Sequence, residues 1–110
     1  MGIARLALRG AVAPFLALAS LLPAQSTTTL DATAPGGKNT VTFDLNHNVS
    51  GIVSVTVNGA PAKVDSKKIE GTKVIVTFGA PAPGAGDVVK VVVEYSGTEP
   101  KVQDVTWSSS

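Results

Sequence analysis

The stretch VVKVVVEY, from Val88 to Tyr95, is the most apolar of the strand-like segments in this chain, and it decides the fold class. Side chains alternate between the two faces of a strand, so one face carries Val89, Val91, Val93 and Tyr95, and the other carries Val88, Lys90, Val92 and Glu94. Valine suits a pleated, half-buried surface. The mid-strand lysine opposes aggregation of a run that is otherwise nearly continuous valine. The stretch therefore predicts a core strand in an all-β domain.

Segments of the same kind recur on both sides of this strand, and glycine, proline, asparagine and aspartate separate them. Six further strands are expected, at Thr27–Thr33, Asn39–Leu45, Gly51–Val57, Ala62–Ser66, Lys73–Phe78 and Val102–Trp107. No long segment has a helical apolar period, and no connection is long enough for a crossover helix between parallel strands. The sequence therefore predicts an immunoglobulin-like antiparallel β-sandwich of about seven strands, preceded by an N-terminal signal peptide.

The alternation within these segments also predicts the core. In Gly51–Val57 the residues Val53, Val55 and Val57 share one face. We expect Val55, Val76, Phe78 and Val91 to point inward from different strands, with Trp107 covering an open end of the sandwich. Asn58-Gly59 predicts a tight hairpin turn. The segment that includes Lys67-Lys68 is expected to be a solvated turn before Glu70-Gly71.

The first 26 residues have the order of a secretory signal peptide. Arg5 and Arg9 precede an apolar run of about 13 residues, which is shorter than the about 20 residues that a membrane span requires. Small residues at Ala24 and Ser26 predict cleavage after Ser26, with cleavage after Ala24 as the second choice and an uncleaved membrane-associated helix as the alternative. The expected domains are a signal peptide at 1–26 and a sandwich at 27–110. The expected location is the periplasm, the cell surface or the medium.

Composition excludes several function classes. Without its two arginines the chain keeps seven lysines against eight acidic residues, a net charge of −1, which provides no basic face for nucleic acid. The absence of cysteine excludes disulfides, thiol catalysis and thiolate metal sites. No serine has a nucleophile-elbow motif, and no glycine-rich segment ends like a phosphate loop. We therefore predict no enzyme, no catalytic residue and no cofactor.

The stretch FDLNHNVSG, from Phe43 to Gly51, is the one place that resembles a chemical site. Its aspartate and asparagines have the two-residue spacing of a calcium loop, but valine occupies the positions that require glycine and glutamate. A looser calcium site between strands, using Asp44, Asn46 and Asp104, is the remaining metal candidate. The only histidine, His47, lacks the partner ligands of a zinc site. We interpret the stretch as a corner whose His47 is a candidate ligand contact.

Four aromatic residues follow the first 26 residues. Phe43 and Phe78 alternate with core valines, so we expect them to be buried. Trp107 either closes the core or stacks on a ligand, and the second possibility keeps a small carbohydrate-binding module as an alternative function. A carbohydrate-binding module is expected to expose an aromatic ring as a flat platform, and burial of all four rings would count against it.

The order of signals from Val53 to Val105, VSVTVNGAPAKVDSKKIEGTKVIVTFGAPAPGAGDVVKVVVEYSGTEPKVQDV, is specific. With VTFDL at Val41–Leu45, it resembles the immunoglobulin-like repeats of large bacterial surface proteins, of the SwmB type. The resemblance covers about Val41 to Val105 and implies an exported, non-catalytic module with a structural, adhesive or protein-binding role. The implied partners are other cell-surface or exported proteins, with a glycan as the alternative. Neither nucleic acid nor a membrane span after signal cleavage is expected.

Overall fold

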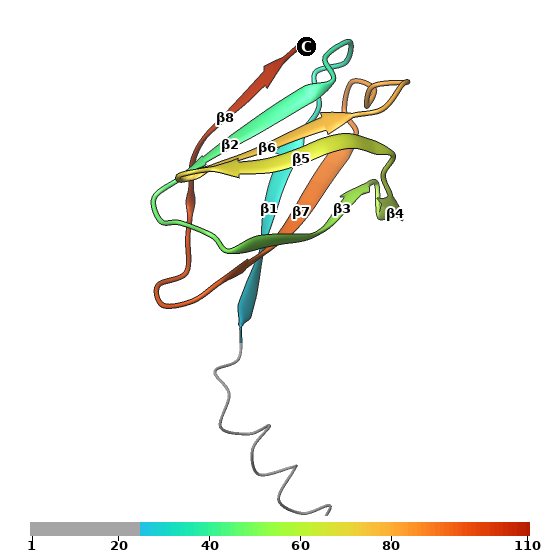
Figure 1. The fold of residues 1–110 in the computed structure, drawn as a ribbon. Helices are drawn as coiled ribbons and strands as arrows, with labels where there is room; N and C mark the ends of the chain where they lie inside the picture. The colour runs from blue at the N-terminus through green and yellow to red at the C-terminus, as the bar shows by residue number, and fades with distance from the viewer. Residues whose placement is uncertain (1–24) are drawn as a thin grey trace, which may run out of the picture.

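The computed structural model describes residues 25–110, which form a sandwich of two four-stranded antiparallel sheets (Figure 1). The predicted all-β antiparallel sandwich is confirmed. Nearly all of the predicted signal peptide lies outside the described residues. The eight strands are β1 (Ser26–Thr33), β2 (Thr40–Leu45), β3 (Gly51–Val57), β4 (Ala60–Pro61), β5 (Val64–Glu70), β6 (Lys73–Phe78), β7 (Val88–Tyr95) and β8 (Val102–Ser108).

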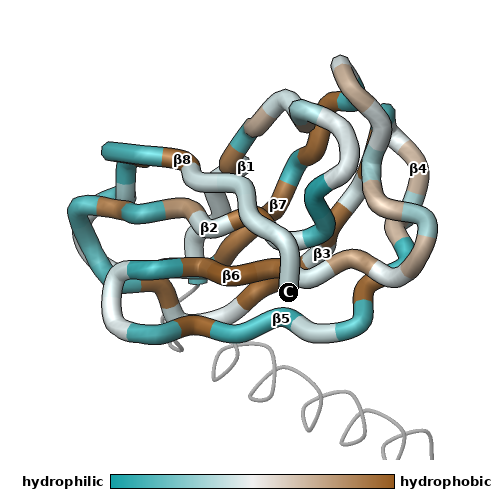
Figure 2. Tube along the Cα trace, turned by 90° about the horizontal axis from the view of Figure 1, so that it is seen from above, coloured by the Kyte–Doolittle hydropathy of each residue, from teal (hydrophilic) through white to brown (hydrophobic). Residues whose placement is uncertain are grey.

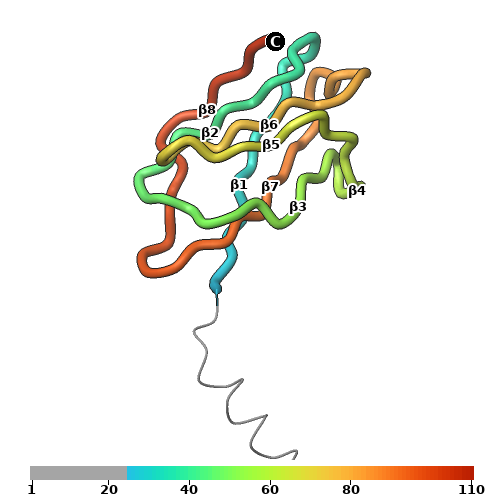
Figure 3. Tube along the Cα trace, in the orientation of Figure 1, coloured from blue at the N-terminus to red at the C-terminus, as the bar shows by residue number. Residues whose placement is uncertain are grey.

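The two sheets interleave strands that are distant in the sequence. The first sheet has the order β1-β7-β3-β4, and the second has the order β5-β6-β2-β8. Consecutive strands often belong to different sheets, so the chain crosses repeatedly between the layers (Figure 3). Strands β3 and β5 lie at one side of the sandwich, and β1 and β8 lie at the other (Figure 2). Within residues 25–110 no helix is long and apolar enough to cross a membrane.

The core lies between the sheets and consists mainly of valine. In the second sheet Val41 lies opposite Val76, and in the first Val91 lies between Leu30 and Val55. Figure 2 shows hydrophobic residues along β6 and β7, the strands with the clearest alternation in the sequence. The inward positions of Val55, Val76, Phe78 and Val91 are confirmed, since each is at most 8% exposed. Burying a valine or a phenylalanine contributes about 1.5–3 kcal/mol, so each of these side chains stabilises the fold substantially.

The prediction of a turn at Lys67-Lys68 is wrong. Both lysines lie in the middle of β5, which continues to Glu70, and the additional two-residue strand β4 precedes β5. Lysine is unfavourable in strands by propensity, but β5 pairs with β6 over nearly its whole length. The cross-strand hydrogen bonds and the inward Ile69 therefore outweigh the local preference.

The expected inward position of Val53 is also wrong. A β-bulge lies between Ile52 and Ser54 in the pairing of β3 with β7, and Val53 is 50% exposed. An extra residue in a strand shifts the phase of every side chain before it. Val55 follows the bulge and faces the core as predicted.

The predicted turn at Asn58-Gly59 is confirmed, and it also closes one end of the sandwich. Both residues have positive φ angles, 52° and 84°, which asparagine and glycine tolerate best. The Asn58 side-chain Oδ1 accepts a hydrogen bond from the Val88 N–H (2.8 Å), and its Nδ2 donates to Asp87 Oδ1 (3.0 Å). The turn between β3 and β4 is therefore held against the start of β7.

Candidate functional site

The corner after β2 is attached to the rest of the sandwich by hydrogen bonds. The Asn46 N–H donates to the Lys101 carbonyl (3.1 Å), and Asn46 Oδ1 accepts from the Lys101 N–H (2.8 Å). At the other end of the corner the Ser50 N–H donates to the Glu94 carbonyl (2.7 Å), and the Val49 side chain is buried. His47 and Asn48 lie at the exposed tip of the corner, between the anchored residues Asn46 and Ser50. The stretch therefore forms an anchored corner on which the His47 side chain is exposed to solvent.

The calcium candidates are only partly brought together. Asp44 lies opposite Asp104 on one side and opposite Lys73 on the other, so two carboxylates and an ammonium share a row across the second sheet. The Asn46 oxygen is already used by the Lys101 N–H. Calcium takes six to eight oxygen ligands. Residues 25–110 contain no group of three His, Cys, Asp or Glu side chains arranged to hold a metal ion.

Trp107 packs at the end of the core. It lies opposite Val41 on the core-facing side of β8, and its ring stacks on Phe78 with a centroid distance of 6.3 Å and an interplanar angle of 12°. The Trp107 side chain is half-buried, as is Tyr95, whereas Phe43 and Phe78 are buried. Phe43, Phe78 and Trp107 thus contribute to the core or its margin, and none of the four rings of the described residues is fully exposed.

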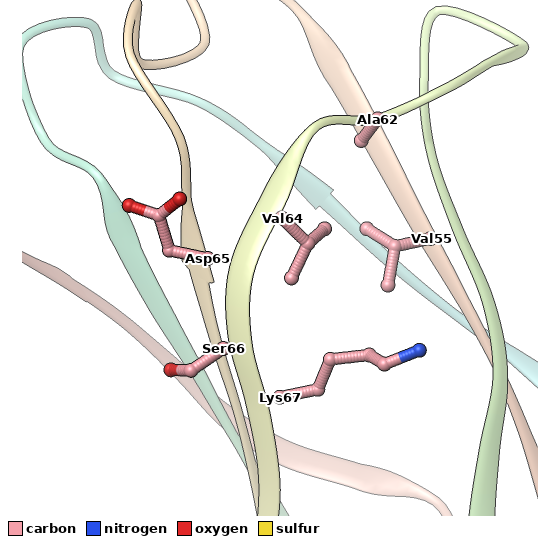
Figure 4. A pocket seen from close by; sticks show the side chains of 6 residues that line it. All are labelled: Val55, Ala62, Val64, Asp65, Ser66 and Lys67. Atoms are coloured by element: carbon pink, nitrogen blue, oxygen red, sulfur yellow. The ribbon is translucent and has the colours of Figure 1, made fainter.

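A depression opens between the two sheets, where β3 faces β5. It has a volume of about 390 Å³ and is lined by Val55, Ala62, Val64, Asp65, Ser66 and Lys67. Val55 and Val64 point toward each other across it, the Lys67 side chain extends over it toward β3, and Asp65 points away (Figure 4). A second hollow of about 300 Å³ lies beside Phe78 and the proline-rich β6–β7 loop.

The role of Lys67 at this opening was missed by the sequence analysis. Lys67 lies opposite Val76, so it occupies a core-facing position at the edge of the second sheet. The regular pairing of β5 with β6 from Ser66 to Glu70 places it there, and the register shift between Val64 and Ser66 brings Val64 to the same face. Lys67 and Ile69 do share an alternating face, but that signal could be used only after β5 had been recognised as a strand.

Asp87 is a carboxylate whose pKa is lowered in the folded protein. The hydrogen bond from Asn58 and that from the Gly84 N–H (2.8 Å) to Asp87 Oδ2 stabilise the ionised form and lower the pKa of Asp87. Both donors belong to turns, so this carboxylate organises the loop end of the sandwich. Every buried side-chain nitrogen and oxygen among the described residues has a hydrogen-bond partner.

The described residues form two sheets with exposed edges and two hollows, of which the one between β3 and β5 carries the ammonium group of Lys67. Their polar side chains mostly close turns and join strands. Comparison with known proteins finds no protein-family model, no curated protein and no solved structure that matches this chain.

Proposed function

We propose that this protein is an exported, non-catalytic immunoglobulin-like module, similar to the repeats of bacterial surface proteins, with a structural, adhesive or protein-binding role. The observation that carries the proposal is the placement of the chain ends. The described chain enters the sandwich at one end and leaves it at the other (Figure 1). A module of this kind can be part of an extended chain without reversing its direction.

Specific contacts hold the two ends in place. Ser26 begins β1, where it lies opposite Tyr95. The last residue, Ser110, donates its N–H to Asn39 Oδ1 (2.9 Å), and its hydroxyl lies 2.9 Å from the Thr40 hydroxyl. Asn39 and Thr40 follow the connection that leaves the far end of β1. An eight-residue strand spans roughly 25 Å, so the ends are separated by about the length of the sandwich.

The aromatic residues support this role over the carbohydrate-binding alternative. A sugar platform needs a flat ring facing solvent, whereas Trp107 lies nearly parallel to Phe78 and packs against the core. We therefore expect Trp107→Ala to lower stability and to leave binding on a glycan array unchanged. Glycan binding that disappeared in a folded Trp107→Ala protein would favour the carbohydrate-binding alternative.

Fractionation of producing cells tests the export part of the proposal. The wild-type chain is expected in the periplasm, surface fraction or medium with a shortened N-terminus. The matched control is Leu16→Arg, which interrupts the apolar run of the signal segment and should keep the full-length chain inside the cell. A wild-type chain that stays inside the cell at full length would overturn the export proposal.

Binding of the folded protein to surface components tests the remaining part. The purified protein is immobilised and compared with Phe43→Asp, which places a charge in a fully buried position and should unfold the sandwich. Retention of surface proteins or whole cells by the wild type alone supports an adhesive or protein-binding role. Turnover of a substrate by the purified protein would contradict a non-catalytic module.

A further inference from the structure

The four outer strands of the two sheets differ in how open they are to another strand. An edge strand presents unpaired N–H and C=O groups, and proteins usually blunt such edges with short strands, prolines, bulges or inward-pointing charges. The first sheet ends in β1 and β4, and the second ends in β5 and β8. Three of these edges carry a blunting feature.

The edges on the β3–β5 side are both blunted. Strand β4 consists only of Ala60 and Pro61, and proline removes a backbone donor. The part of β3 that β4 leaves unpaired contains the β-bulge between Ile52 and Ser54. Strand β5 contains a register shift between Val64 and Ser66, and Lys67 occupies a core-facing position in its middle. The Lys67 side chain extends over the opening between the sheets (Figure 4). A strand added to β5 would have to cover this ammonium group, which is costly without a counter-charge.

The edge of β1 is blunted by the connection from β7 to β8. This connection passes from the first sheet to the second beside β1 (Figure 3). Thr28 Oγ1 donates to Glu99 Oε2 at 2.7 Å, and the adjacent Pro100 is buried. A strand approaching the first half of β1 would therefore meet this segment.

The edge of β8 has no comparable protection. Its pairing with β2 is regular from Asp104 to Ser108, and its only register shift lies at the start of the strand. The strand contains no proline and no lysine, and most of its residues are exposed. Backbone groups alternate in direction along a strand. Because the Ser110 N–H points to Asn39 on the β2 side, the N–H groups of Val105 and Trp107 point away from β2.

We propose that β8 pairs with β8 of a second copy of this chain, antiparallel and about a twofold axis at Val105. The two second sheets then form one continuous eight-stranded sheet. This register places Val105 opposite Val105 of the second copy and Asp104 opposite its Thr106, so no like charges meet. Moving the axis to Asp104 would place two carboxylates opposite each other, which is destabilising. The inference does not depend on export or on the proposed function.

A single introduced thiol tests the register, because the chain has no cysteine of its own. Val105 is central in the proposed interface, and the Cα atoms of a hydrogen-bonded antiparallel pair lie about 5.5 Å apart. That distance is within the usual disulfide range of about 4.4–6.8 Å. Under mild oxidation Val105→Cys is expected to form a disulfide dimer rapidly. The control Val53→Cys places a thiol at a 50% exposed position on β3, away from β8, and should cross-link slowly. Equal cross-linking rates would overturn the proposal.

Sedimentation velocity over a wide range of protein concentration tests the interface without cross-linking. The wild type is expected to sediment as a dimer at high concentration, whereas Val105→Lys, which copies the position of Lys67 onto β8, should remain monomeric. The matched control Thr106→Lys adds the same charge on the outer face, opposite Asp104 of the second copy, and should keep the dimer. Thermal melts verify that both variants are folded. A monomeric wild type at all concentrations would overturn the proposal, as would a dimer that Val105→Lys does not weaken.

The converse substitution tests the blunting role of Lys67. In Lys67→Val both edges of the second sheet can pair, so dimers can join through β5 into longer assemblies. We expect larger species for Lys67→Val than for the wild type, and no such change for Lys68→Val on the opposite face of β5. If both lysine variants behaved alike, the assigned difference between the β5 and β8 edges would be wrong.

Discussion

Replacing Phe78 by alanine probes the packing at the end of the core. Phe78 is 3% exposed, ends β6 and stacks on Trp107 at 6.3 Å. Its N–H donates to the Asn39 carbonyl (2.8 Å), an interaction that the substitution leaves in place. The expected loss of stability therefore comes from the side chain alone.

The magnitude follows from burial and from the surroundings of the ring. Truncating a buried phenylalanine to alanine costs about 3–5 kcal/mol, and the cost depends on how far the site can collapse. The hollow of about 300 Å³ beside Phe78 already opens to solvent. The space left by the removed ring would be continuous with this hollow, so water could fill it. We therefore expect the lower part of the range, about 3–4 kcal/mol. A domain of this size has a total stability of about 4–13 kcal/mol, so the variant loses about a quarter of it or more.

Urea unfolding followed by fluorescence measures this loss. The chain has one tryptophan, Trp107, so the signal reports on the partner of Phe78. Phe78→Leu retains most of the apolar volume and should lose less than about 1.5 kcal/mol. His47→Ala, at the exposed tip of the corner, should change stability by no more than about 0.5 kcal/mol. A loss below about 1 kcal/mol for Phe78→Ala, or a larger loss for His47→Ala, would refute the packing argument.

Three further predictions concern metal, pH and processing. Thermal melts should be unchanged by EDTA and by added calcium, because the candidate carboxylates lack enough oxygen partners; a rise of several degrees with calcium would show a metal site. Folding lowers the pKa of Asp87, so the ionised carboxylate stabilises the fold at pH values above its pKa in the unfolded chain, near 4. This stabilisation is lost as the pH falls through the pKa of Asp87 in the folded protein. Between pH 7 and pH 2 the melting temperature of Asp87→Asn should fall less than that of the wild type, and identical pH profiles would contradict this prediction. Mass spectrometry of the exported protein should find a start at Thr27 or, for the second cleavage site, at Gln25. The form that starts at Gln25 keeps Ser26, which pairs with Tyr95, and the hydrogen bond that Gln25 Oε1 accepts from the Ser50 hydroxyl (2.8 Å). It should therefore be the more stable by about 0.5–1.5 kcal/mol in denaturant melts, and equal stability would count against these contacts.

Local alternation was sufficient to predict most strands and the centre of the core. The patterns of Lys73–Phe78 and Val88–Tyr95 place valines at every second position, and the structure buries those at Val74, Val76, Val89, Val91 and Val93. The period of two is a property of the strand itself, so it can be recognised without knowing which strands pair. The turn at Asn58-Gly59 was predictable for the same reason, because positive φ angles are a local requirement.

The corner after β2 shows where local reasoning was incomplete. The polar residues of FDLNHNVSG correctly indicated a corner, but its anchoring depends on Lys101, which lies 55 positions after Asn46. A side-chain oxygen can serve a metal ion or a backbone N–H, and the sequence does not show which group lies nearby. The structure assigns the Asn46 oxygen to the backbone and leaves His47 exposed.

By itself, the sequence determined the all-β class, the core-facing valines and the tight turn, because each follows from the conformational preferences of neighbouring residues. Only the tertiary structure decided that Lys67 faces inward, that Val53 faces outward and that β8 is the least protected edge. The position of Val53 follows from a register shift, in which one extra residue reverses the faces of a strand, whereas that of Lys67 follows from the pairing of β5 with β6. The third depends on which strands lie at the margins of each sheet, and that order is set by hydrogen bonds between segments far apart in the chain.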